Sequence, residues 1–137
     1  MFVSCFLVIG YCDRREHMAK ILIIDDEEPI LKMYGSALTG HEVLMAKNGE
    51  EGLEMARVEE PNLILLDIIM PKMNGLDVLE KLRSDKDTES IPVLMLTNLP
   101  QEASADKANA LGAQGYFVKA EFEPEKLAEE VNRALES

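Results

Sequence analysis

Residues 62–75 have the sequence NLILLDIIMPKMNG, and this stretch decides the fold class. After Asn62 every residue up to position 66 is apolar, so a strand here would have no polar side. Strands that are buried on both faces are typical of a parallel sheet covered by helices. Pro71 and the dipeptide Asn74-Gly75 then indicate a turn before the next helix.

The same order of apolar run, turn and amphipathic helix recurs along the chain. Further strands are expected at 20–24, 42–46, 92–96 and 116–118. Helices are expected at 29–38, 49–58, 76–82, 103–111 and 124–135. Strands that alternate with helices in this way predict an α/β domain with a five-stranded parallel sheet, doubly wound as (βα)5.

The composition limits the function. The chain has 137 residues, of which 47% are hydrophobic, so it suits one globular domain. Its net charge of −12 argues against nucleic acid as a direct partner, because phosphate backbones are bound by Lys and Arg. The apolar run 2–12 is too short to span a bilayer, so no membrane span is expected.

Residues 1–17 differ from the rest and contain both cysteines, Cys5 and Cys12. The segment lacks the basic start that a secretory signal would need, and Met18 opens the segment that contains the first strand. We interpret 1–17 as an extension from cloning or from a mis-assigned start, and 18–137 as the domain. The alternative, a membrane-surface anchor, lacks basic flanks. Residues 18–137 have no cysteine, which excludes disulfides and thiol chemistry there, and a cytoplasmic location is expected.

Polar residues follow four of the expected strands. They are Asp25-Asp26, Asp67, Thr97 and Lys119. Because the carboxyl ends of parallel strands meet at one edge, these residues should converge there. Each has a bland explanation as a helix cap, a turn residue or a solvated charge. These separate explanations do not account for all of the residues together, because two carboxylates ~4 Å apart repel by about 4 kcal/mol at an intermediate dielectric.

A divalent cation and Lys119 would offset that repulsion. The ligands are hard oxygens, without Cys or His beside them, which favours Mg²⁺, Mn²⁺ or Ca²⁺ over zinc. A cation that bridges a carboxylate and a phosphoanion also permits phosphoryl transfer. Asp67 is the expected nucleophile, because its strand is central and lies between the acid pair and Thr97.

These residues resemble those of response-regulator receiver domains. The matching motifs are IDDEE at 24–28, LLDIIMPKMNG at 65–75, LTN at 96–98 and VK at 118–119. The resemblance extends from residue 18 to about residue 136. It implies the flavodoxin-like strand order 2-1-3-4-5 and a phosphoacceptor switch, not a turnover enzyme. The phosphoryl group would reach Asp67 from a sensor histidine kinase or a histidine phosphotransfer protein.

The resemblance also implies the metal ligands. Asp26, Asp67 and the backbone carbonyl of Ile69 would bind Mg²⁺ directly, with Mn²⁺ as a substitute, and Asp25 would act through water. Ile69 and Leu99 are apolar and offer no hydrogen bond to a hydrolytic water. We therefore expect slow self-dephosphorylation.

The switch residues follow from the same resemblance. Lys119 would pair with Asp67 and then with the phosphoryl group, Thr97 would move to bond that group, and Tyr116 would swing inward. For Tyr116 the alternative is packing alone. The domain would signal to an unknown downstream protein through the face formed by the helix at 103–111, the strand at 116–118 and the helix at 124–135. Ala120 stands where the family usually has proline, so a trans bond and a looser loop are expected there.

Three other functions compete with this interpretation. A flavin-binding module shares the strand order, but the acids at 25–28 would repel a flavin phosphate. A metal-dependent phosphatase would need a second Asp where Ile69 stands. A degenerate receiver that only binds partners would not need all five polar groups. Neither the kinase nor the target can be identified, and a monomer is expected, with dimerisation on phosphorylation as the alternative.

Overall fold

The structure, a computed structural model, describes residues 18–97, 107–119 and 123–136. In this part of the chain five strands form one parallel sheet in the order β2-β1-β3-β4-β5. The strands are β1 (Lys20–Ile24), β2 (Glu42–Ala46), β3 (Leu63–Asp67), β4 (Val93–Thr97) and β5 (Gly115–Val118). The predicted fold class and strand order are confirmed.

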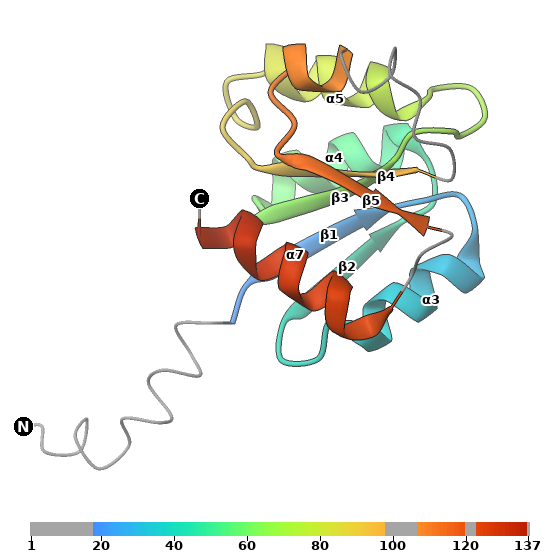
Figure 1. Ribbon diagram of the computed structural model, residues 1–137. Coiled ribbons are helices and arrows are strands. Elements are labelled where there is room, and N and C mark those ends of the chain that lie inside the picture. The colour runs from blue at the N-terminus through green and yellow to red at the C-terminus, as the bar shows by residue number, and fades with distance from the viewer. Residues whose placement is uncertain (1–17, 98–106, 120–122, 137) are drawn as a thin grey trace, which may run out of the picture.

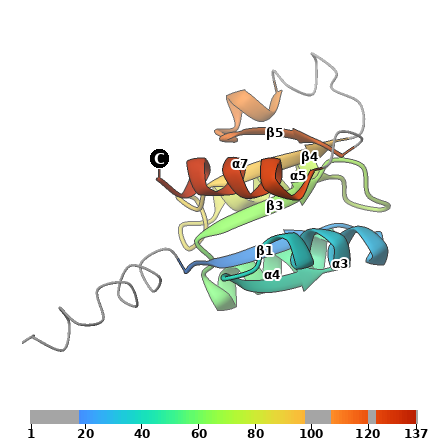
Figure 2. The same ribbon diagram turned by 60° about the horizontal axis from the view of Figure 1, so that its bottom comes forward.

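Helices cover both faces of the sheet. They are α3 (Glu28–Ala37), α4 (Gly49–Glu59), α5 (Gly75–Ser84) and α7 (Pro124–Glu136). Helices α3 and α7 pack together on one face, and α4 and α5 pack together on the other (Figure 1). Figure 2 shows α7 lying across its face of the sheet. The helix expected at 103–111 is described from residue 107, and residues 107–110 are helical.

The central strand β3 is buried along its whole length, as its apolar run predicts. Ile64 and Leu66 enter the core cluster beneath α4 and α5, whereas Leu63 and Leu65 enter the cluster beneath α3 and α7. Burial of each such side chain stabilises the fold by about 1.5–3 kcal/mol. The strand is therefore a firm base for the residue at its end.

Two strands run one residue further than expected. Asp67 ends β3 and Thr97 ends β4, although the apolar runs stop one residue earlier. The ladder continues because it is made by backbone groups, and the N–H of Ile68 still donates to the carbonyl of Leu96 over 3.1 Å. The backbone of Asp67 is thus held by the sheet and not by a loop.

The interpretation of residues 1–17 as an extension lies outside the described residues. Among those that are described, no helix is both long enough and apolar enough to cross a membrane.

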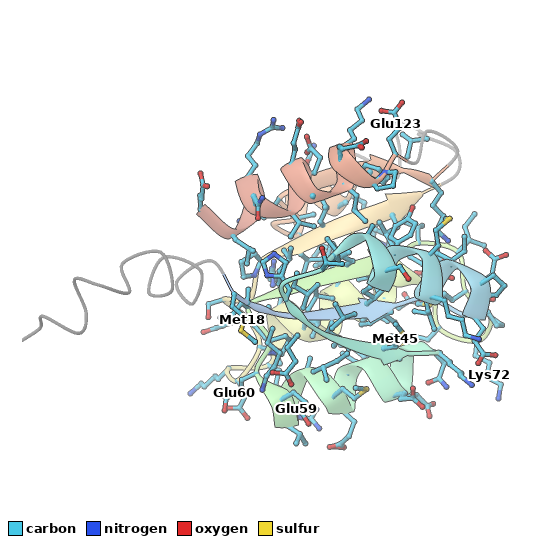
Figure 3. The ribbon with its side chains drawn as sticks, turned by 90° about the horizontal axis from the view of Figure 1, so that it is seen from below. Met18, Met45, Glu59, Glu60, Lys72 and Glu123 are labelled. Atoms are coloured by element: carbon cyan, nitrogen blue, oxygen red, sulfur yellow. The ribbon has the colours of Figure 1, made fainter. Side chains whose placement is uncertain are left out.

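Glu60 follows α4 as its C-cap residue in a left-handed conformation, with φ of 48°, and its N–H donates to the carbonyl of Ala56. This residue lies at the end of the domain away from Lys72 (Figure 3). A residue with a side chain destabilises the fold by about 1–2 kcal/mol in this conformation. Glycine avoids this strain but loses about 0.5–1 kcal/mol more in chain entropy on folding. We expect Glu60→Gly to raise the free energy of unfolding in urea by about 0.5–1 kcal/mol.

The control is Glu89→Gly, which makes the same charge change at an exposed residue whose φ is not positive. This variant should lose stability, because glycine relieves no strain there. Equal shifts of the two urea midpoints would contradict the prediction.

Candidate functional site

Two aspartates meet at the carboxyl ends of neighbouring strands. Asp25 follows β1 and Asp67 ends β3, and both are buried, with exposed fractions of 0% and 4%. Backbone groups orient both carboxylates. Glu27 N–H donates to Asp25 Oδ1 over 2.9 Å, and Ile69 N–H donates to Asp67 Oδ1 over 3.3 Å. The two acids are therefore fixed side by side in the protein interior.

Lys119 bridges these two acids. It follows β5, its exposed fraction is 7%, and its Nζ lies 3.2 Å from Asp67 Oδ1. The same nitrogen lies closer to Asp25 Oδ2, at 2.6 Å, although this contact lacks hydrogen-bond geometry. The sequence predicted a lysine paired with Asp67 and an Asp25 that acts through water. In the structure Lys119 contacts both carboxylates, and Asp25 is its nearer partner.

Exposed acids complete the group. Carboxylate oxygens of Asp25, Asp26 and Glu27 lie within 4.8 Å of one another, and the side chains of Asp26 and Glu27 are exposed. This donor set contains only oxygen atoms and carries several negative charges, so it fits a hard divalent cation such as Mg²⁺. The contact of Glu27 with this group was not predicted, although the run of acids after β1 contained the signal.

The burial of charge perturbs the pKa values. Burial, followed by the charge of Asp25, raises the pKa of Asp67 to about 7, although Lys119 and the N–H of Ile69 oppose this shift. Burial alone would lower the pKa of Lys119, but its contacts with Asp25 and Asp67 raise that pKa above its ordinary value. Burial and then the charges of these two acids raise the pKa of Tyr34, which lies inside α3. Such shifts gather at functional sites.

The raised pKa of Asp67 predicts a pH dependence of stability without divalent cations. In the unfolded chain the pKa of an aspartate is about 4, so protonation of Asp67 favours the folded state. This contribution is present below about pH 4 and is lost as the pH rises to about 7. We expect the stability gained by Asp67→Asn, measured by urea unfolding in EDTA, to be larger at pH 8 than at pH 5. The same gain at both pH values would contradict the shift.

The switch residues are placed by their backbones. Thr97 is the last residue of β4 and pairs with Val118, and Tyr116 on β5 pairs with Met95. Their side chains lie outside the described part of the structure, as do Leu99 and Ala120. The backbone thus brings Thr97 to the same sheet edge as Asp67 and Lys119, whereas Tyr116 lies further back along β5.

Fold and site together define a class of protein: flavodoxin-like α/β domains with an acid–lysine cluster at the carboxyl edge of the sheet. A family model for the response regulator receiver domain matches residues 21–132. Protein PilH of Pseudomonas aeruginosa is 38% identical over 120 residues, which cover 86% of this chain and 98% of that protein. The chain therefore belongs to the response regulator receiver domain family.

Other comparisons agree. The structure of chemotaxis protein CheY4 of Vibrio cholerae has a TM-score of 0.81 and 34% identity, over 85% of this chain and 98% of that one. The probable transcriptional regulator ycf27 of Porphyra purpurea is 39% identical over 118 residues, but the chain spans only about half of its length (47%). Members of the family are switches of two-component signalling and not classical enzymes. Phosphorylation and Mg²⁺ binding are typical of them.

Proposed function

We propose that this receiver domain accepts a phosphoryl group on Asp67 from a sensor histidine kinase or a histidine phosphotransfer protein. The supporting observation is the contact of Lys119 with both Asp67 and Asp25 at the end of the central strand. A carboxylate there can act as the nucleophile, while the ammonium stabilises charge on the transferred oxygens. A buried, oriented acid with a perturbed pKa supports the assignment of the nucleophile to Asp67.

Mg²⁺, or Mn²⁺ in its place, is the proposed cofactor. Asp26, Asp67 and the backbone carbonyl of Ile69 would hold it directly and Asp25 through water, and the all-oxygen acid group at the site supports a hard cation. The cation would neutralise charge between the nucleophile and the incoming phosphoryl group. Asp67 also attacks phosphorus as the bond between phosphorus and the donor histidine breaks, and Lys119 binds the phosphoryl oxygens.

The proposed output is a change of surface. Thr97, Lys119 and Tyr116 would respond to the phosphoryl group and alter the face formed by the helix around 107–110, β5 and α7, which an unknown downstream protein would bind. We place the receiver domain at 18–137 and the protein in the cytoplasm, as a monomer that can dimerise on phosphorylation. We propose no direct nucleic-acid or membrane contact and no turnover of a substrate.

The test is uptake of a phosphoryl group from acetyl phosphate, or of beryllofluoride, with Mg²⁺ and with EDTA. Intact mass and amide NMR should report an adduct that needs Mg²⁺ and perturbs the amides of Asp67, Thr97 and Lys119. No adduct under either condition would contradict phosphorylation, and the same adduct in EDTA would contradict the role of Mg²⁺.

Ile69 supplies a separate prediction about the lifetime of the adduct. Its side chain is 66% exposed, and its N–H contacts Asp67, so it stands where a hydrolytic water would approach. We expect Ile69→Asn, or Ile69→Glu, to speed phosphate loss by about tenfold, because a polar group there can position water. Ile69→Leu is the matched control and should keep the slow rate. An unchanged lifetime in Ile69→Asn would contradict the prediction.

A further inference from the structure

Glu27 stands at the N-cap of α3, but its side chain makes no capping hydrogen bond. Ser, Thr, Asp and Asn at this position usually accept a bond from the first turn of their helix, whereas glutamate is not among the usual capping residues. Instead, Glu27 Oε1 lies 3.8 Å from Nζ of Lys119, and the side chain is 57% exposed. The carboxylate is thus directed towards the lysine of the phosphoacceptor site and not towards its own helix.

Lys119 therefore has three carboxylates around it at graded distances. Asp25 Oδ2 lies at 2.6 Å, Asp67 Oδ1 at 3.2 Å and Glu27 Oε1 at 3.8 Å. The two nearer acids are buried and held by backbone N–H groups, so they cannot follow the ammonium if it moves. The side chain of Glu27 is half-exposed, so its carboxylate can follow the ammonium.

A divalent cation and the ammonium would compete for the same oxygens. An ammonium that lost Asp25 without a replacement would be a nearly buried charge with too few partners, and such a charge is costly. We propose that Glu27 is the alternate counter-ion of Lys119, which holds the ammonium at the mouth of the site when a divalent cation occupies the aspartates. This inference rests on the proposed function of the same site.

Glu28 offers a matched control. It is the next residue in the chain, and its side chain is 60% exposed. Its ion-pair partner is Lys47 instead of Lys119, with 3.7 Å between Oε1 of Glu28 and Nζ of Lys47. Glu27→Gln and Glu28→Gln make the same change in net charge at adjacent exposed positions. A difference between the two variants therefore reports the local contact with Lys119, not the general field of the acids.

The experiment is a titration of the full chain with MgCl₂, followed by amide NMR. Glu27→Gln should raise the Mg²⁺ dissociation constant about tenfold, and Glu28→Gln about twofold, since exposed charges are screened. The pair is then repeated in a Lys119→Met background. In that background the effect of Glu27→Gln on the Mg²⁺ dissociation constant should fall to that of Glu28→Gln, because the ammonium that Glu27 pairs with is absent.

Two outcomes would overturn the inference: equal effects of the two variants, or a full effect of Glu27→Gln that persists with Lys119→Met. The latter would make Glu27 a ligand of the cation itself. Uptake of acetyl phosphate by the unaltered chain is measured in parallel. If Mg²⁺ binding and uptake are normal and either outcome occurs, only the counter-ion role is wrong. If the unaltered chain binds no Mg²⁺, the counter-ion role and the proposed function are both wrong.

Discussion

Asp67→Asn is expected to take up no phosphoryl group from acetyl phosphate, even in saturating Mg²⁺. An amide has no charged oxygen to attack phosphorus, and it is a poor ligand for the cation that the attack requires. Asparagine has nearly the same shape and can keep the acceptor for the N–H of Ile69, so the fold should persist. Intact mass after incubation gives the result, and amide NMR confirms that the variant is folded.

Asp87→Asn makes the same chemical change at an exposed residue in the turn after α5 and should leave uptake unchanged. An adduct of full yield on Asp67→Asn would contradict the assignment of the phosphoacceptor. In that case Asp25 and Asp26 would be the next residues to replace, because they share the same edge of the sheet.

The fold could be predicted because one strand has no polar face. The apolar run before Asp67 requires cover on both sides, and alternation with helices supplies it. The sheet edge that holds the site followed from the same pattern, since parallel strands end together. Strand ends were less predictable: Asp67 and Thr97 belong to the ladder because backbone hydrogen bonds do not depend on side-chain polarity.

The partners within the acid group could not be predicted from topology. Topology brings Asp25, Asp67 and Lys119 to one edge but does not say which acid the ammonium approaches more closely. That choice depends on side-chain orientation, which the N–H of Glu27 sets for Asp25. The role of Glu27 was hidden for a related reason, since the sequence does not show that its side chain leaves its own helix and approaches Lys119.

Gly75→Ala is expected to destabilise the domain by about 3 kcal/mol or more, because the added methyl group has no space. An ideal Cβ at Gly75 would lie 2.1 Å from the carbonyl oxygen of Asp67 and 2.7 Å from Cα of Ile68. Both are backbone atoms, so no rotamer change relieves the clash. The N–H of Gly75 donates to the carbonyl of Ile68 over 2.7 Å, which holds α5 against the residues that leave β3.

Gly40→Ala separates this cause from the conformational freedom of glycine. Gly40 has φ of 92°, yet an added Cβ would meet nothing within 4 Å, so its cost should be the backbone strain alone, about 1–2 kcal/mol. Urea unfolding compares the two variants. Similar losses of stability in the two variants would contradict the prediction and would mean that the backbone around Asp67 can shift at little cost to accept a methyl group. A much larger loss of stability at Gly75 would show that α5 packs rigidly on the phosphoacceptor strand. The Gly75→Ala protein that remains folded should then also accept a phosphoryl group from acetyl phosphate more slowly, because Asp67 is displaced.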